Sequence, residues 1–348
     1  MALKVRNADL AIDREVLFSL LQRNLNVPPD PQRYAWLYYD NPCGTAWAWI
    51  IYETDSQEVV GSASVFPRAV WIEGQVRRCG QVSHFSIDSR YRSLGPALLL
   101  QRATFEPVTT GALDLSYDAP PHAQGMATFQ RLGMQESCYL DRYARPLRVN
   151  RRLEKFLGRN VVTACIAGLA NHLLALRRGR NPVMHGVEVA EFEERFTEEF
   201  SVLDTVLGPV FPIHGRRRAE DLNWKYRDDP SYNYRVWTAR RRGELVAFAI
   251  IAIDGHEARI ADLFGYDDST LCYLLEEIVD FVHKHGSIET IHALISEYAS
   301  QRAILEAADF QQRERPIRIV AYTTEKSGLW ATIAQPQYWF FTYGDYTT

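Results

Sequence analysis

The sequence predicts an α+β protein made of two similar units in tandem, each a mixed, mostly antiparallel sheet flanked by helices. Two observations lead to this prediction. Residues 1–146 are patterned in the order helix, antiparallel strands, strand–loop–helix, strand, helix, strand. The motif Trp-x-Tyr-x-Asp-x-Pro at 36–42 returns 188 residues later, at 224–230, and a similar order of elements follows it. Such a repeat indicates that one fold occurs twice in the chain.

Hydrophobic periodicity and turn residues define the elements of the first unit. Residues 10–25 carry apolar side chains on one helical stripe, and Pro28 ends the helix. The strand at 137–143 is expected to close the sheet of this unit. The other predicted elements are strands at 47–52, 59–66, 82–87 and 112–117, a hairpin at 69–76, and helices at 98–103 and 122–132.

The second unit and the segment before it follow by the same reasoning. We predict domains at 1–146 and 188–348, joined by a helical connector at 147–187. The apolar helix at 161–176 is too short to span a membrane and is expected to bridge the units. A peripheral membrane role is the disfavoured alternative, because its apolar residues do not segregate against a basic face. The predicted elements of the second unit are strands at 234–239, 245–253, 258–264 and 288–295 and helices at 271–282 and 303–308.

Composition excludes several classes of protein. The 348 residues carry a formal net charge of −4, which argues against nucleic-acid binding. The five cysteines are scattered and the nine histidines lack metal spacing, so we expect a reducing compartment, no disulfide and no metal site. Residues 1–10 have charges and no apolar core, so we expect no signal peptide and a cytoplasmic protein.

One stretch of the first unit has the pattern of an anion site. The strand at 82–87 is followed by a turn at 88–90, and residues 92–97 then open a helix. The first turn of a helix offers unpaired N–H groups and a favourable dipole to a negative charge. Gly95 and Ala97 are small where a phosphate would approach the backbone. The alternative is an ordinary strand–helix connection without a ligand.

This stretch resembles the acyl-CoA loop of the GNAT superfamily of N-acyltransferases. The family pattern, Arg or Gln, two residues, Gly, one residue, Gly or Ala, is filled by Arg92, Gly95 and Ala97. Pro96 differs from the family pattern in one respect, because it has no N–H and therefore removes one possible donor to a phosphate. The segment Phe129-Gln-Arg-Leu-Gly-Met also stands where the family usually has Tyr-x-x-x-Gly-Phe.

The resemblance implies direct acyl transfer from acetyl-CoA, or another acyl-CoA, to an amine. The thioester would lie along the strand, its carbonyl held by a backbone N–H, and the pyrophosphate would sit at the helix start. His122 stands where many relatives have Asn. The cofactor-binding residues implied in this way are Phe85, Ser86, Ile87, Arg92, Ser93, Leu94, Gly95, Pro96, Ala97, His122 and Phe129.

The catalytic groups are less well defined by the sequence. The family acid is commonly a Tyr at the position of Phe129, so Tyr117 is the nearest substitute. His84, Asp88 and Asp118 are the candidate bases. Two of them have structural alternatives, since His84 would equally suit a hydrogen-bonded core and Asp88 a turn.

The second unit is expected to lack a CoA site. Its counterpart of the loop has Asp267 and Asp268, which would cap the helix and repel a pyrophosphate. This unit would then complete the substrate cleft or stabilise the first. The aromatic tail at 330–346 is expected to pack in the core.

The acceptor is indicated only loosely. The Trp-x-Tyr-x-Asp-x-Pro element resembles that of two-domain GNAT relatives linked to bacterial polysaccharide synthesis, which suggests a small-molecule amine or an amino sugar. One alternative is a non-catalytic acyl-CoA-binding or structural module. Another is a tandem-GNAT aminoacyl transferase of cell-envelope synthesis that uses charged tRNA; the net charge and the 92–97 loop count against it.

Overall fold

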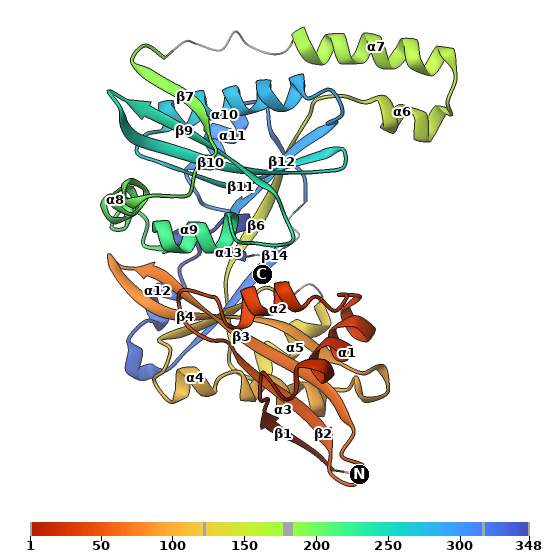
Figure 1. Cartoon of the computed structure of the whole chain (residues 1–348), viewed down its shortest axis with the longest axis vertical. Helices are drawn as coiled ribbons and strands as arrows, with labels where there is room; N and C mark the ends of the chain where they lie inside the picture. Colours follow the sequence, from red (N-terminus) through yellow and green to blue (C-terminus); the bar gives the residue numbers. More distant parts are fainter. Residues whose placement is uncertain (1, 121–122, 177–183, 315–316, 347–348) are drawn as a thin grey trace.

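The computed structural model describes residues 2–120, 123–176, 184–314 and 317–346, and its main strands join into one continuous sheet (Figure 1). The strand order is β1-β2-β3-β4-β5-β14-β6-β12-β11-β10-β9-β7. The order of the first five strands is mirrored by the last five. We call the part that contains β1 to β5 the front half and the part that contains β7 and β9 to β12 the rear half. The short strands β8 (Ile213–Gly215), β13 (Gln311–Gln312) and β15 (Trp339–Phe340) lie off this path.

The front half follows the predicted order of elements, with additions. A first strand and a second helix were not predicted, and the predicted hairpin is part of two long strands. The elements are β1 (Leu3–Asn7), α1 (Arg14–Leu25), α2 (Pro31–Tyr38), β2 (Trp47–Glu53), β3 (Val59–Ile72), β4 (Gln75–Ile87), α3 (Leu94–Ala103), α4 (Glu106–Thr109), β5 (Leu115–Asp118) and α5 (Ala123–Arg131).

The rear half repeats this order, except that the described residues hold no counterpart of α4 and that the short strand β8 lies between its first two helices. A strand and two helices precede its meander, and a long helix stands at the position of α3. The elements are β7 (Val187–Phe192), α8 (Glu198–Leu207), α9 (Ala219–Tyr226), β9 (Tyr234–Arg241), β10 (Glu244–Asp254), β11 (Glu257–Gly265), α10 (Asp268–Lys284), β12 (Thr290–Ser296) and α11 (Gln301–Ala307). The tail adds α12 (Trp330–Ile333) and α13 (Tyr343–Tyr346).

The two halves exchange their last strands. β6 (Gln135–Pro146) follows the front half but pairs with β12 of the rear half, whereas β14 (Ile317–Thr323) follows the rear half but pairs with β5. The prediction that residues 137–143 close the front sheet is therefore wrong. Each exchanged strand covers an edge that would otherwise be open, and the two strands pair with each other at the centre.

The repeated tryptophans meet at the junction of the halves. Trp36 of α2 stacks on Trp224 of α9, with ring centroids 4.9 Å apart and planes 22° apart. The Trp36 Nε1–H donates to the Trp224 carbonyl (2.7 Å), and the Trp224 Nε1–H donates to the Trp36 carbonyl (2.9 Å). The repeat thus marks a pseudo-twofold contact between the halves.

Replacing Trp36 or Trp224 by Phe should reveal this contact. Each change keeps most of the stack but leaves a buried carbonyl without its donor, which typically destabilises by about 1–3 kcal/mol. Trp237→Phe is the control, because the buried Trp237 Nε1 has no hydrogen-bond partner among the described residues. Denaturant unfolding should show similar losses for the first two variants and none for the third. Unequal losses would contradict the reciprocal contact.

The connector forms a helical hairpin outside the sheet. α6 (Asn150–Leu157) and α7 (Val161–Leu176) pack on each other, and Figure 1 shows them at the end of the rear half that is farther from the front half. The expectation that the apolar helix bridges the two halves is therefore wrong. In the described part of the chain, no helix combines the length and apolarity needed to cross a bilayer.

Candidate active site

Two neighbouring strands of the front half separate and form a fork. β4 and β5 pair in parallel as far as Gln81 and Tyr117, whereas β4 continues along β3 to Ile87. A β-bulge accompanies the separation, because the register between β3 and β4 slips by one residue around His84, whose φ is 53°. A bulge bends its strand and redirects its side chains. We call β4 residues 82–87, beyond the last pair with β5, the front fork.

The start of α3 stands at the end of the front fork. Ser93 is its N-cap but makes no side-chain cap, and among the described residues the N–H groups of Leu94 and Gly95 have no hydrogen-bond partner. The N–H of Ala97 bonds to the Ser93 carbonyl at 3.3 Å. A Cβ added at Gly95 would meet no atom within 4 Å. This helix start therefore offers two free donors, a helix dipole and open space.

Arg92 adds positive charge next to this helix start. Its exposed guanidinium donates from Nε to the Ile87 carbonyl at 2.8 Å and from Nη2 to Asn24 Oδ1 at 3.1 Å. These bonds fix the loop to the last residue of β4 and to the last turn of α1. The structure thus brings the predicted residues 92–97 together with the fork.

The predicted residues on β4 face both sides of the sheet. Phe85 and Ile87 pack with Leu100 of α3 in one apolar cluster, and the buried Pro96 lies in the first turn of α3. Ser86 is buried on the other face, where its Oγ lies 3.2 Å from Ser62 Oγ. The buried side chains of Ser86 and Ile87 fix this part of β4 in the sheet.

His84 takes part in a small polar network. Its Nδ1 lies 3.0 Å from the Tyr38 hydroxyl, which is itself 2.9 Å from Ser64 Oγ, and its ring packs edge-on against Phe66. Burial, helped by the charge of Arg33, lowers the pKa of His84 to about 3. A histidine of this kind is neutral near pH 7, and its left-handed backbone builds the bulge.

Asp88 is bound in an ion pair with α1. Its two carboxylate oxygens accept from Arg23 Nε and Nη2, both at 2.7 Å, and Asn24 Nδ2 adds a third bond at 2.8 Å. Burial alone would raise the pKa of Asp88, but the hydrogen bonds from Arg23 and Asn24 outweigh it and the pKa falls below its usual value. Asp88 therefore fixes the turn after β4 to α1 and is a poor proton acceptor.

Tyr117 and Asp118 lie at the branch point of the fork. The buried Tyr117 donates its hydroxyl to the Asp345 carbonyl at 3.0 Å, and burial raises its pKa. Asp118 is the first β5 residue beyond the last pair with β4, and its Oδ1 accepts from the Ala119 N–H at 2.6 Å. Burial raises the pKa of Asp118 to about 7, which is suited to proton transfer at neutral pH.

The remaining predicted residues lie on or before α5. Phe129 is buried in an apolar cluster with Phe105 and Met126, so its ring supports the helix. His122 lies outside the described residues.

The rear half has an equivalent fork, and the C-terminal tail fills it. β11 and β12 pair as far as Ile260 and Ala293, and β11 also carries a one-residue bulge before it ends at Gly265. Thr342 bridges to β12, and a Cβ at Gly344 would collide with the Tyr226 hydroxyl. Segment 341–346 therefore lies in the rear fork, and it also reaches the branch point of the front fork, where the Tyr346 carbonyl accepts from Gln81 Nε2 and the Asp345 carbonyl accepts from Tyr117.

The start of the rear helix differs as predicted. Asp267 caps α10, since its Oδ1 accepts from the Thr270 N–H at 2.8 Å. In the aromatic tail, Trp339, Phe340 and Phe341 are buried as predicted, whereas Tyr338 is exposed.

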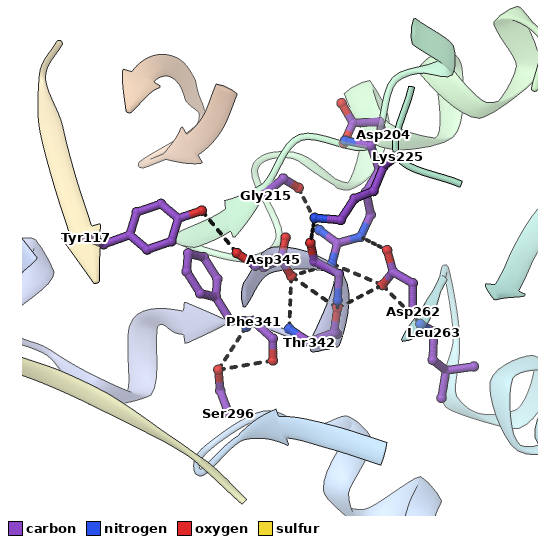
Figure 2. Close-up of polar contacts among 12 residues, drawn as sticks. Tyr117, Asp204, Gly215, Lys225, Asp262, Leu263, Ser296, Phe341, Thr342 and Asp345 are labelled. Carbon is purple, nitrogen blue, oxygen red and sulfur yellow. Dashed lines mark hydrogen bonds and ion pairs between the residues drawn. The ribbon is translucent and has the colours of Figure 1, made fainter. Parts of the chain in front are cut away.

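A buried charge cluster holds the tail in place (Figure 2). Arg217 donates to both oxygens of Asp262 at 2.9 and 3.1 Å and to Asp345 Oδ2 at 2.8 Å. Lys225 donates to the Gly344 carbonyl. Burial, together with the charge of Arg68, lowers the pKa of Lys225 to about 7.

A small cavity between the halves reaches from this cluster to Tyr117 at the branch point. Its volume is about 50 Å³, and Arg68, Tyr117, Lys225 and Asp345 are among its lining residues. Lys225 and Asp345 were not among the predicted site residues, although Lys225 lies inside the repeated motif, where the front copy has Leu37. No group of residues suited to hold a metal ion occurs in the described ranges.

Comparison with known proteins bears on the fold. No protein-family model and no curated protein sequence matches the chain. Among solved structures it is similar to a GCN5-related N-acetyltransferase from Anabaena variabilis (TM-score 0.67, 12% identity, 94% of this chain and 74% of that one). It is also similar to a probable N-acyltransferase from Enterococcus faecalis (TM-score 0.64, 12% identity, 93% and 73%).

A third similar structure is the N-myristoyltransferase of Saccharomyces cerevisiae with bound myristoyl-CoA (TM-score 0.60, 11% identity, 92% of this chain and 82% of that one). Each match spans more than nine-tenths of the chain and therefore includes both halves. Together with the mirrored strand order, these similarities show that the chain has the GNAT fold in tandem.

Proposed function

We propose that the chain is an N-acyltransferase that moves an acyl group from acyl-CoA directly to an amine at the front fork. The observation that carries this proposal is the fork between β4 and β5, which leads to a helix start with two N–H donors unpartnered among the described residues and space at Gly95. A thioester lying along a strand edge and a pyrophosphate on a helix start would suit these two features. The similarity to a structure with bound myristoyl-CoA supports the same class of cosubstrate.

The residues around the front fork would act in two ways, by positioning the acyl-CoA and by accepting a proton from the amine. The backbone N–H groups of β4 would polarise the thioester carbonyl, and those of Leu94 and Gly95 would bind phosphate oxygens. Asp118 would accept the proton of the attacking amine, because it stands at the branch point and its pKa is about 7. His84 and Tyr38 would hold the bulge that aims the strand.

The proposed base predicts a specific pH dependence. Because the folded pKa of Asp118 is about 7 against an ordinary 3.8, its contribution to stability is complete below pH 3.8 and is lost as the pH rises to about 7. Activity should rise over the upper part of that range as the carboxylate forms. Asp118→Asn should lower kcat by about 10²–10⁴-fold and remove this limb of the pH–rate profile.

The control is Asp114→Asn. Asp114 lies on the same segment before the branch point, and its carboxylate accepts from the Arg78 N–H. The Asp114→Asn variant should keep the kcat of the unaltered chain and the rise of activity with pH. An unchanged limb in Asp118→Asn would assign the proton to another group.

Two measurements test the activity itself. Calorimetric titration with CoA, acetyl-CoA and longer acyl-CoAs measures binding and the preferred acyl length. Detection of released thiol against a panel of amines, amino sugars included, then identifies the acceptor. A small-molecule amine is the proposed acceptor class, and the resemblance to polysaccharide-linked relatives makes amino sugars the first to try. Binding without turnover of any amine would instead indicate a non-catalytic module.

A further inference from the structure

The α6–α7 hairpin exposes apolar side chains at its tip and along α7. The exposed fractions are 74% for Phe156, 80% for Val161, 68% for Val162 and 64% for Leu169. Leu157, Cys165 and Ile166 are exposed as well. Single exposed apolar residues are normal, but a contiguous group of this kind marks an interaction surface.

The polarity of α7 is inverted relative to an ordinary surface helix. The sixteen residues of Val161–Leu176 include no Asp, Glu, Lys or Arg. Thr163 is buried, and its Oγ1 donates to Asn160 Oδ1 in the turn before α7, whereas Asn171 Oδ1 accepts the N–H of Val149, the N-cap of α6, at 3.0 Å. Two polar side chains of α7 thus serve contacts within the hairpin, His172 is exposed, and most of the outward-facing residues are apolar. A surface helix normally has the opposite arrangement.

The charges that the hairpin itself carries are mainly positive, whereas Glu257 and Glu289 of the rear half line a surface pocket together with Arg151, Lys155 and Arg159. Residues 150–172 contain four Lys or Arg and one Glu, within a chain whose net charge is −4. Lys155 and Arg159 flank the tip and are exposed. The one acid, Glu154, accepts from Arg159 Nε at 2.9 Å. The base of the hairpin is fixed to the sheet by the bond from the Arg151 N–H to Glu289.

We propose that the tip, residues 155–162, and the outer face of α7 dock on the surface of a bilayer that contains anionic phospholipids. Aliphatic and aromatic side chains would enter the boundary between headgroups and acyl chains, and the flanking Lys and Arg would meet the phosphates. At about 1.5 Å per residue, α7 is about 24 Å long, enough to lie in the interface but short of spanning it. A peripheral membrane role was disfavoured from the sequence because α7 has no basic face. The exposed basic residues Lys155 and Arg159 lie instead in the tip of the hairpin.

A bilayer fits this surface better than a second copy of the chain. Two hairpins packed face to face would bring their positive flanks together, and the remainder of the chain is acidic overall. An anionic bilayer satisfies both the apolar and the cationic parts. The hairpin lies at the end of the rear half away from the front half (Figure 1), so docking would leave the front fork free.

Co-sedimentation of the full chain with vesicles tests the proposal. We expect binding to vesicles of phosphatidylcholine with phosphatidylglycerol, weaker binding to pure phosphatidylcholine, and release by salt. Val161→Glu and Phe156→Glu should each weaken binding by about tenfold or more. The matched control is Val202→Glu on α8, where a valine 54% exposed lies outside the hairpin. Lys155→Gln and Arg159→Gln together should weaken binding only to the anionic vesicles.

Three results would overturn the proposal: no binding to anionic vesicles, equal loss in the Val202→Glu control, or binding unaffected by salt and by phosphatidylglycerol. A dimer in solution that Phe156→Glu converts to a monomer would assign the surface to a second copy instead. Circular dichroism of each variant checks that it is folded, and the salt series on the unaltered chain needs no variant. This test is independent of acyltransferase activity.

Discussion

Arg217→Met is expected to lower the free energy of unfolding by about 3–5 kcal/mol, because it leaves two buried carboxylates without their shared cation. Asp262 and Asp345 both bond to this guanidinium, and Arg217 is about 2% exposed. Its aliphatic and planar parts also pack on Phe264 and Phe340. Methionine preserves much of that packing, so the loss reports mainly on the charges. Denaturant unfolding measures it.

The control for this prediction is an exposed ion pair of the same type. Arg195 bonds to both oxygens of Asp228, but its side chain is 61% exposed. Arg195→Met should cost less than about 1 kcal/mol. Equal losses in the two variants would mean that the cluster under the tail contributes no more than a surface pair.

Gly95→Glu should weaken acyl-CoA binding by about 100-fold or more, which is the second large effect. A carboxylate at the start of α3 would occupy the two free N–H donors and repel a pyrophosphate. Like charges about 4 Å apart interact by about 4 kcal/mol at an effective dielectric constant near 20. Calorimetric titration measures the loss.

Two variants at the same position separate charge from shape. Gly95→Ala should bind almost normally, because a Cβ there meets no atom within 4 Å. Gly95→Lys adds a long side chain without the negative charge and should retain binding. If Gly95→Glu bound as well as the unaltered chain, the phosphate site would lie elsewhere.

The two halves show how one fold can keep a site and lose it. Both retain a bulge in the fourth strand of the meander and a fork beyond it. The front helix begins with free N–H groups, whereas Asp267 caps the rear one. Residues 341–346 fill the rear fork, whereas in the front half they contact the branch point at Gln81 and Tyr117. The difference at the helix start can be recognised in the local sequence, at Asp267, whereas the occupation of the rear fork by residues 341–346 cannot.

Local patterns predicted the parts of the fold that depend on neighbouring residues. The strand before the loop ends at Ile87 as predicted, and the helix begins at Leu94 within the predicted 92–97 stretch. The exchange of β6 and β14 was missed because period-two alternation fits either partner and does not specify which sheet a strand joins. The strand β1, of five residues, and the helix α2, of eight, were not predicted.

The site was harder to predict than the fold because it depends on burial. His84 and Asp118 were equal candidates by residue type, and only their surroundings separate a histidine with a pKa of about 3 from a carboxyl with a pKa of about 7. Asp88 resembled a turn residue, and its pairing with Arg23 depends on a contact across 65 positions. The contact of Asp345 with Arg217 spans 128 positions, which no local pattern reveals.

The structure of the chain crystallised with CoA would test the central claim most directly. The account predicts one CoA per chain, with its pyrophosphate on the N–H groups of Leu94 and Gly95 and its pantetheine arm along β4 beyond Gln81. Residues 341–346 should remain in the rear fork. Density for the nucleotide beside β11, after displacement of that segment, or away from both forks, would contradict the account.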